Sequence, residues 1–388
     1  MKIVHICLAN YYVDGMAYQE NLLTKYHAKE HEVVIITSDY AFNARGEKIR
    51  KKQKEYFNEY GIPVKVLDRS KRYGAYSKYN DFENVYSTLC EIKPDVIFCH
   101  GGQFIALKDV IKYRRKNEKV KLFIDQHADY YNTPIDTLRQ YLGQRLIYGF
   151  WMRRAIKYTE MFWGVTPWRC EYLRDVYRIP TEKIGFLPLG ADDEKMQIQE
   201  RPCIFRKIRH DLNIRDTDFL IVSGGKINQE KQIDKLMQAV TDINKDDLQL
   251  VIFGQPDQSM EERIERLSLH NSVHFIGWIP SDLVYNYFLA ADLAMFPGTH
   301  SVLWEQACAC GIPGVFREWP GMKHVDLGGN ARFLKEGSLE EIKDVLLDIY
   351  NNPPKYEKMK AVAQREGLET FSYSKIARKA ILESNENE

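Results

Sequence analysis

The chain has 388 residues, 44% of them hydrophobic and 28% charged, with a formal net charge of +1. This composition is typical of globular proteins and excludes collagen-like, low-complexity and strongly charged disordered chains. No apolar run approaches the roughly 18 residues of a membrane-spanning helix. Seven cysteines without a C-x-x-C pair favour the reducing cytoplasm.

The two halves of the chain carry opposite charge. Residues 1–190 contain 31 Lys and Arg against 22 Asp and Glu, which leaves 24 against 32 of the chain totals of 55 and 54. We therefore expect the basic half to meet an anionic partner, such as phospholipid headgroups or a lipid diphosphate. The basic runs at 48–54, 69–78 and 112–121 carry no recognition motif for nucleic acid, so no nucleic-acid partner is expected.

Short β-branched runs alternate with amphipathic stretches along the whole chain. In the first half the pattern predicts helices at 16–31 and 81–91 and strands at 2–8, 32–37, 64–67, 95–99, 121–125 and 161–165. After the polar stretch 192–216 it predicts helices at 233–243, 260–268, 282–290, 302–310 and 339–351 and strands at 219–223, 249–253, 273–276, 293–296 and 314–316.

This alternation indicates an α/β fold of two Rossmann-like domains, each a doubly wound parallel sheet. We predict one domain over residues 1–191 and a second over 192–365. Residues 366–388 are expected to form a C-terminal helix that packs back on the first domain. Because parallel sheets bind ligands at the carboxyl ends of their strands, the chemistry is expected in a cleft between the domains.

The strongest local signal is the run Ser223-Gly224-Gly225-Lys226 and the residues that follow it to Asp234. Glycines after a strand permit a tight turn, and a helix amino terminus offers N–H groups to an anion. Lys226 and Lys231 are placed to reach one diphosphate. The Gly-Lys-Ser/Thr ending of a P-loop is absent, and two exposed lysines beside an ordinary turn remain the alternative.

A second signal follows the strand that ends at Phe296. The loop Gly298-Thr299-His300-Ser301-Val302 leads into a helix and presents backbone N–H groups that suit a phosphate. Glu305, one turn into that helix, is placed to accept hydrogen bonds from a ribose diol. Taken singly, Glu305 also reads as a solvated helix residue and His300 as a capping residue.

These segments resemble the nucleotide-binding half of glycosyltransferase family 4, whose members have the GT-B fold. The resemblance rests on Gly225, Lys226 and Lys231, on Val273-x-Phe275-x-Gly277, on the helix from Glu305 to Pro313, and on Pro188-x-Gly190-x-Asp192 at the domain joint. It implies a donor site that includes Trp278 and Ile279, and a transfer that retains anomeric configuration. One departure is that Pro297 occupies the place of the family's first glutamate. Either His300 and Ser301 take over the contacts to sugar and phosphate, or the catalytic geometry differs.

The resemblance also implies that residues 1–191 form the acceptor-binding domain and residues 192–365 the nucleotide-sugar-binding domain, and it assigns residues in the first half. Gly15 matches the family's glycine-rich loop near the donor, and His127, at the end of a strand, matches a histidine that contacts the donor sugar. Tyr18, Gln19 and Asn21 either bind the acceptor or only form a helix start. His5, His27 and His31 have no comparable placement.

Two further segments carry weaker signals. Asp216-Thr217-Asp218 matches the Asp-x-Asp of metal-dependent transferases but precedes a strand, so neither a metal nor any other cofactor is expected. In residues 141–158, aromatic and aliphatic residues alternate with cations at helical spacing. That pattern fits either a core helix with a basic face or a helix resting on the anionic inner face of a membrane.

The predicted protein is a metal-independent hexosyltransferase. It would move a sugar from a nucleoside-diphosphate sugar, with UDP-sugars favoured, to a glycan or lipid-linked glycan in polysaccharide biosynthesis. His127, Lys226, Lys231 and Glu305 are its expected catalytic residues. The alternatives are a sugar-nucleotide epimerase of the same architecture and a catalytically silent sugar-nucleotide-binding protein.

Overall fold

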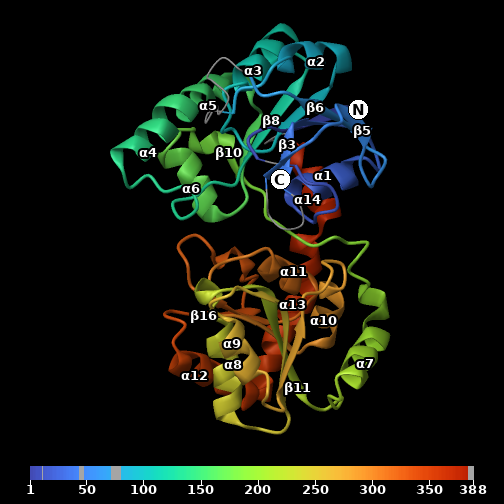
Figure 1. The fold of residues 1–388 in the computed structure, drawn as a ribbon, viewed down its shortest axis with the longest axis vertical. Coiled ribbons are helices and arrows are strands. Elements are labelled where there is room, and N and C mark those ends of the chain that lie inside the picture. The colour runs from blue at the N-terminus through green and yellow to red at the C-terminus, as the bar shows by residue number, and fades with distance from the viewer. Residues whose placement is uncertain (11, 43–47, 71–79, 383–388) are drawn as a thin grey trace. The chain divides into compact units, whose positions relative to one another are not determined.

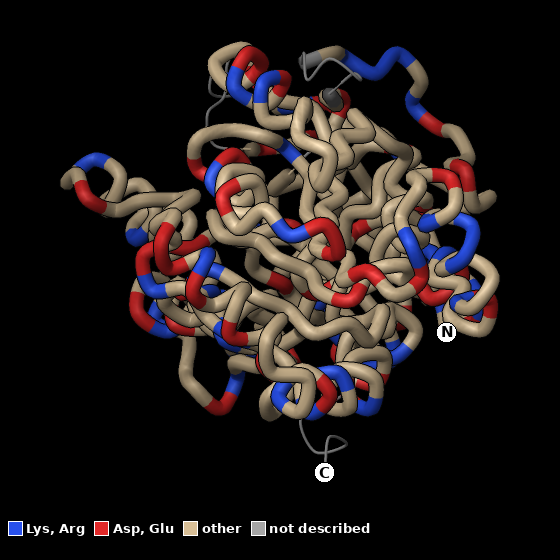
Figure 2. Tube along the Cα trace, turned by 90° about the horizontal axis from the view of Figure 1, so that it is seen from below, with Lys and Arg blue, Asp and Glu red and all other residues tan. Residues whose placement is uncertain are grey.

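The computed structural model describes residues 1–10, 12–42, 48–70 and 80–382. The chain divides into two compact units. Unit 1 comprises Met1–Pro188 together with Ile376–Glu388, and unit 2 comprises Leu189–Lys375. Most of the basic run at 69–78, and the polar tail after residue 382, lie outside the described residues. Figure 2 shows Lys and Arg interspersed with Asp and Glu along the chain.

Unit 1 is built on an eight-stranded sheet in the order β10-β9-β8-β7-β1-β2-β6-β5. All pairings are parallel except that of β5 with β6. The strands are β1 (Lys2–Cys7), β2 (Glu32–Ser38), β5 (Glu55–Phe57), β6 (Pro63–Leu67), β7 (Val96–Cys99), β8 (Lys121–Gln126), β9 (Met161–Gly164) and β10 (Ile184–Phe186), and the short β3 (Tyr40–Phe42) and β4 (Lys48–Arg50) pair separately. The helices are α1 (Gln19–His27), α2 (Val85–Ile92), α3 (Leu107–Lys116), α4 (Leu138–Leu142), α5 (Gly149–Ala155) and α6 (Pro167–Asp175).

Unit 2 is built on a six-stranded parallel sheet in the order β13-β12-β11-β14-β15-β16, with helices on both sides (Figure 1). The strands are β11 (Phe219–Ile227), β12 (Leu248–Pro256), β13 (Val273–Gly277), β14 (Leu293–Phe296), β15 (Gly314–Arg317) and β16 (Ala331–Leu334). The helices are α7 (Arg201–Asp211), α8 (Ile233–Ile243), α9 (Glu261–Leu267), α10 (Val284–Ala290), α11 (Leu303–Ala309), α12 (Leu339–Tyr350) and α13 (Pro353–Phe371). The predicted pair of doubly wound α/β sheets is confirmed.

Each sheet is buried on both faces, which explains why its central strands are continuous apolar runs. In unit 2, Ile221, Leu250 and Met295 from three neighbouring strands pack in one cluster with Leu236 of α8 and Ile342 of α12. In unit 1, strand and helix residues likewise pack in a cluster that includes Ile6, Ile97, Leu89 and Val110. The two cores hold the strand ends in fixed positions.

Several boundaries differ from the prediction. Strand β11 continues to Ile227 in register with β12, so Gly225 and Lys226 lie on a strand and not in a turn. Helix α1 begins only at Gln19, because Tyr18 is extended, and ends at His27. No helix begins at residue 366, which lies inside α13, because Pro353 starts that helix and it continues to Phe371.

The chain returns to unit 1 through α14 (Tyr373–Ala380). Within unit 1, the indole Nε1 of Trp163 donates to Ala380 O at 3.0 Å, and Arg378 pairs with Glu30 at 2.7 Å. This last segment therefore closes the core that the first 188 residues begin.

Residues 138–158 form several short helical pieces in place of one regular helix. A π-helical turn, Gly143–Tyr148, separates α4 from α5. Among the described residues, no helix is long and apolar enough to cross a membrane.

Candidate functional site

The strand orders mark where each unit is able to bind a ligand. In unit 2 the order reverses between β11 and its neighbour β14, and in unit 1 between β1 and β7. Loops that leave such neighbouring strands in opposite directions open a crevice at the carboxyl edge of a parallel sheet. The predicted residues near Lys231 and His300 follow β11 and β14, whereas Gly15 follows β1.

The two predicted loops of unit 2 pack directly on each other. After β11 the chain forms a single 3-10 turn, Gln229–Lys231, in which the Asn228 side chain accepts from Lys231 N. The ammonium Nζ of Lys231 donates to Thr299 O at 2.7 Å and to His300 O at 2.9 Å. In return, Thr299 N donates to Glu230 O at 3.0 Å. Lys231 thus fixes the loop after β14.

Glycine is required at position 298 by this contact. A Cβ on Gly298 would lie 2.2 Å from Glu230 O and 2.4 Å from the Lys231 backbone. Any larger residue would push the two loops apart. At Gly225 the requirement is conformational instead, because its φ of +106° suits glycine.

Burial changes the chemistry of Lys231. It lowers the pKa of the ammonium to about 8, against a smaller opposite effect from Glu230. Two of the three N–H groups of the Lys231 ammonium donate to carbonyls. The ammonium therefore retains one N–H donor, and it keeps its positive charge near neutral pH. Lys226 differs, because its side chain is exposed on β11.

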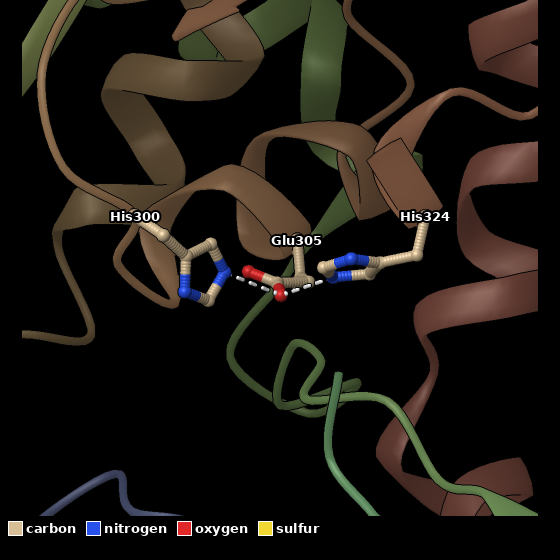
Figure 3. Close-up of side chains that lie close together, drawn as sticks. All are labelled: His300, Glu305 and His324. Carbon is tan, nitrogen blue, oxygen red and sulfur yellow. Dashed lines mark hydrogen bonds and ion pairs between the residues drawn. The ribbon is translucent and has the colours of Figure 1, made fainter. Parts of the chain in front are cut away.

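Glu305 lies under this loop, between two histidines (Figure 3). Its Oε1 accepts from Nε2 of His300 and from Nε2 of His324, each at 2.8 Å. His300 precedes α11, Glu305 lies on α11, and His324 lies in the 3-10 turn Lys323–Val325. The Glu305 side chain is fully buried, which differs from the predicted contact with a ribose diol.

The charge of Glu305 is stabilised from within the protein. Burial alone would raise the pKa of this carboxyl, but the imidazoles of His300 and His324 outweigh burial and hold the pKa well below its usual range. Its Oε2 has no hydrogen-bond partner among the described residues. The structure therefore uses Glu305 to orient two imidazoles.

The same three side chains are the metal-ligand candidates of the described residues, with ligand atoms all within 4.8 Å of one another. Zinc bonds of about 2.0–2.1 Å at tetrahedral angles place ligand atoms about 3.3 Å apart. The two N–O separations of 2.8 Å are hydrogen-bond lengths instead. The observed geometry is that of a hydrogen-bonded carboxylate.

The other predicted residues of unit 2 lie at the ends of strands or in loops. Trp278 is 69% exposed directly after β13, and Ile279 follows it half-buried. Ser301 and Val302 are half-buried, and Val302 caps α11 without a side-chain bond. Within the Asp-x-Asp triplet, Asp218 pairs with Arg215 at 2.7 Å.

In unit 1, the predicted loop after β1 is exposed at Gly15, whose N donates to Glu59 Oε1 at 2.9 Å. Of the predicted acceptor residues, Tyr18 is exposed, whereas Gln19 and Asn21 are buried. The Asn21 amide donates to Val13 O at 3.0 Å, so this residue holds the loop from inside. Helix α1 turns both side chains inward, and the acceptor contact of Tyr18, Gln19 and Asn21 stays a prediction.

A chain of buried polar side chains, which we call the histidine relay, crosses the interior of unit 1. Its members are His27, His5, His100 and Asp125. His27 Nδ1 lies 2.9 Å from His5 Nε2, His5 Nδ1 lies 2.9 Å from His100 Nε2, and His100 Nδ1 lies 2.9 Å from Asp125 Oδ2. At the far end, His27 Nε2 lies 2.7 Å from Ala377 O.

The relay reaches the predicted sugar contact. Asp125 Oδ1 accepts from Gly101 N at 2.8 Å and lies 3.5 Å from Nε2 of His127. Burial lowers the pKa of His27 to about 4, and burial followed by the neighbouring imidazoles holds the pKa of His5 well below its usual range. Burial opposes ionisation of Asp125, but His127 and His100 outweigh it and keep the pKa of Asp125 below its usual range.

Sequence reasoning found His127 and His300 but missed the relay and His324. A signal was present in the relay: His5 interrupts the apolar run of β1, and His100 directly follows that of β7. A histidine in or next to a strand that is buried on both faces needs a polar partner. His5 and His100 are such partners for each other.

Comparisons with known proteins agree with this architecture. Residues 204–366 match the family described as glycosyl transferases group 1. An alpha-monoglucosyldiacylglycerol synthase of Streptococcus pneumoniae is 29% identical over 157 residues, which are 37% of this chain and 35% of that protein. A mannosylfructose-phosphate synthase of Agrobacterium fabrum is 21% identical over 57% of this chain and 52% of its own length. The chain thus matches about a third to a half of the length of these curated relatives.

Solved structures match over almost the whole chain. HepE of Anabaena in complex with UDP superposes with a TM-score of 0.69 at 17% identity, over 98% of both chains. A UDP-GlcNAc 2-epimerase of Neisseria meningitidis gives 0.63 at 16% identity, over 98% of this chain and 99% of its own. The chain has the GT-B fold. Its residues 204–366 match group 1 of the glycosyltransferases, which confirms the predicted resemblance to GT-B glycosyltransferases; family 4 membership and retention of configuration stay predictions.

The carboxylate between two imidazoles predicts a stability effect. We expect Glu305→Gln to lower the free energy of unfolding by about 1–3 kcal/mol, because the neutral amide bonds the imidazoles less strongly than the buried carboxylate. Urea denaturation measures the change, and the exposed Glu262→Gln is the matched control. Equal stability of Glu305→Gln and wild type would contradict this role of the carboxylate.

The buried imidazoles predict a pH effect of known sign. His5 and His27 are neutral in the folded protein but titrate near their ordinary value of about 6.5 when unfolded. Between about pH 6.5 and 4 the unfolded state therefore binds up to two more protons, and stability falls by up to about 2.7 kcal/mol per pH unit as the pH is lowered. Denaturation at several pH values measures the slope. His27→Gln should reduce it, whereas His210→Gln, at a 91% exposed side chain, should not.

Proposed function

We propose that the protein is a glycosyltransferase that moves a hexose-type sugar from a nucleoside-diphosphate sugar to a hydroxyl group of a glycan or lipid-linked glycan. The observation that carries the proposal is the contact of Lys231 with the loop after β14, at the point where the strand order of unit 2 reverses. This contact places a positive charge beside backbone N–H groups at the edge where parallel sheets bind phosphates.

The mechanism follows from the charge that develops during transfer. Breaking the bond between the sugar and the diphosphate leaves negative charge on the phosphate, and a fixed cation with aimed N–H groups stabilises that charge. Lys231 supplies the cation with its remaining N–H, and exposed Lys226 adds a second cation. The loop from Gly298 to Val302 supplies backbone N–H groups other than that of Thr299, which donates to Glu230 O. No metal takes part in this scheme.

The buried carboxylate gives His300 a defined role in the proposal. Because Glu305 fixes Nε2 of His300, the imidazole is held in one orientation on the loop that receives the phosphate or sugar. This replaces the predicted ribose contact of Glu305 and fits the loss of the family's first glutamate at Pro297. Trp278 and Ile279 are proposed to flank the base, and His127 and Gly15 of unit 1 to meet the sugar.

The names of similar proteins support the substrate classes. HepE has been solved with UDP and with UDP-glucose, which favours a UDP-sugar donor here. Two relatives from Streptococcus pneumoniae are synthases of glucosylated diacylglycerols, which favours a lipid-linked acceptor. The UDP-GlcNAc 2-epimerase of Neisseria meningitidis keeps an epimerase as the second candidate.

The donor site is tested by thermal shift with UDP, GDP and ADP. We expect one nucleotide, UDP, to raise the melting temperature, and Lys231→Ala to weaken its binding at least tenfold, because the variant loses the cation and loosens the loop. For the wild type, affinity should also fall as the pH rises above about 8, where free Lys231 loses its proton. The exposed Lys207→Ala of α7 is the matched control.

Two further outcomes separate the alternatives. If no nucleotide shifts the protein, the proposed donor site is wrong. NMR of the donor sugar alone distinguishes the enzymes, because an epimerase converts its donor without an acceptor and a transferase does not. A protein that binds UDP but neither hydrolyses nor transfers the sugar would be the silent binding protein.

A membrane-facing surface is proposed on unit 1. Leu138, Leu142, Leu146 and Phe150 follow one another at four-residue spacing and are 39–73% exposed. Arg154 lies 4.7 Å from the centre of the Phe150 ring. Apolar side chains among cations suit the interface of an anionic membrane, where a lipid-linked acceptor would be found. The proposed location is therefore the inner, cytoplasmic face of a membrane.

We expect the double variant Leu146→Ser/Phe150→Ser to bind vesicles of anionic phospholipid about thirtyfold more weakly than wild type. Two apolar side chains that enter the membrane interface contribute about 1 kcal/mol each, and each 1.4 kcal/mol is a factor of about ten in affinity. Sedimentation with vesicles measures the loss. Leu269→Ser, which changes an 80% exposed leucine of unit 2, is the matched control. Equal sedimentation of the double variant and wild type would remove this surface from the proposal.

A further inference from the structure

The histidine relay ends in two groups that only accept hydrogen bonds. One end is the Asp125 carboxylate and the other is the backbone carbonyl of Ala377. Between them stand three imidazoles, linked to each other and to the two ends by four contacts of 2.7–2.9 Å. Each contact of this length between nitrogen or oxygen atoms needs one proton between its atoms.

Counting protons shows that neutral imidazoles do not suffice. A neutral imidazole carries one N–H, so three of them supply three protons for four contacts. If every ring were neutral, one contact would bring two lone pairs together at less than 3 Å inside the core. One proton beyond those of three neutral rings and an ionised carboxylate satisfies all four contacts at once.

We infer that the relay His27–His5–His100–Asp125 binds one excess proton at neutral pH, with His100 as the imidazolium and Asp125 as its carboxylate partner. The tautomers of the other rings follow from this assignment. His100 donates through Nδ1 to Asp125 and through Nε2 to His5 Nδ1. His5 then donates through Nε2 to His27 Nδ1, and His27 donates through Nε2 to Ala377 O.

The position of the excess proton follows from its neighbours. A carboxyl ordinarily releases its proton near pH 4 and an imidazole near pH 6.5, so the proton prefers a ring to Asp125. Among the rings, His100 alone is bonded to the carboxylate, at 2.9 Å, whereas His5 and His27 are buried among other imidazoles. An imidazolium next to the carboxylate also leaves the buried relay without net charge, which lowers the cost of burial.

Few other charged groups face the relay. His31 lies 6.4 Å from the His27 ring, and the exposed pair Glu30 and Arg378 lies beyond it. Phe98 stacks on His5 at 5.5 Å. The carboxylate of Asp125 helps to raise the pKa of the two buried thiols, Cys7 and Cys99, after burial as the main cause. Glu20 and Lys51 also act on the thiol of Cys7.

The bound proton gives His100, and through it His5 and His27, a positioning role that rests on the proposed function. With His100 charged, Asp125 stays ionised and its Oδ1 faces Gly101 N–H and Nε2 of His127. An ionised Asp125 favours the form of His127 that carries a proton on Nε2. The far end depends on Ala377, so docking of α14 in unit 1 and protonation of the relay are linked.

The inference is tested on the full-length protein by nitrogen NMR with ¹⁵N-labelled histidine. At pH 7.5 we expect both His100 nitrogens to show the shifts of an imidazolium, and His5 and His27 to carry protons on Nε2 only. Assignment uses single His→Gln variants, and His210→Gln, at an exposed side chain, leaves the relay signals unchanged. Three neutral rings at pH 7.5, or Nδ1 protons on His5 and His27, would overturn the inference.

The variant Asp125→Asn supplies a second readout. Without the anion, the excess proton should leave, and the imidazolium signals of His100 should disappear at pH 7.5. If they persist, the carboxylate does not hold the proton and the assignment is wrong. Where this variant does not fold, the wild-type spectrum alone decides.

Activity is read separately from the proton. If the protein transfers sugar, Asp125→Asn should change kcat/KM at least tenfold at neutral pH and so alter its pH profile. The reason is that His127 loses the carboxylate that orients it. An unchanged profile would contradict the positioning role. An imidazolium at His100 in a protein that transfers no sugar would confirm the excess proton on the relay and refute the proposed function. Failure of the inference and failure of the proposed function are therefore distinguishable.

Discussion

A fully buried carboxylate cannot keep its charge in an apolar core without partners, and both units of this protein solve that problem in the same way. Asp125 in unit 1 and Glu305 in unit 2 are each completely buried, and each lies between two histidines. Asp125 lies near the carboxyl end of the parallel strand β8, and Glu305 lies on α11, the helix that follows the parallel strand β14. The charge of each carboxylate is thus tied to imidazoles that lie near the loops where ligands are expected.

The two carboxylates have different effects on their surroundings, because their histidines contact the carboxylate oxygens in different ways. In unit 2 both histidines donate to the same oxygen, so the cluster is closed and serves to orient His300 on its loop. In unit 1 the two histidines approach different oxygens of Asp125, and His100 continues into the relay. One cluster fixes a side chain, and the other connects a surface-accessible histidine with the interior.

Much of the fold could be predicted from the sequence, because strands buried on both faces are continuous apolar runs. The strands near Ile6, Ile97, Ile221 and Leu293 were found in this way. Short edge strands such as Ile184–Phe186 were missed, since three residues carry too little pattern. The extent of β11 was missed because glycines usually mark a turn, whereas here Gly224 and Gly225 pair with β12.

The site could be predicted only where its residues follow strands in sequence. Lys231 and His300 follow neighbouring strands, so their proximity was foreseeable, whereas the use of the ammonium to hold backbone carbonyls was not. Glu305 was assigned to a ribose because it lies one turn into the helix after the loop and matches the family's Glu-Ala-x-Ala-x-Gly-x-Pro helix. Its burial depends on His324, 19 residues further along the chain, and no local pattern announces that contact.

The return of the chain to unit 1 has a consequence for biosynthesis. The segment from Ile376 follows the whole of unit 2, yet it supplies the carbonyls of Ala377 and Ala380 that bond His27 and Trp163. Until that segment leaves the ribosome, unit 1 lacks these contacts with α1 and β9. Unit 2, which precedes the segment in sequence, is already able to fold at that stage. During synthesis, unit 1 therefore stays incomplete while unit 2 folds. Synthesis begins with unit 1, but unit 2 is the first to be complete.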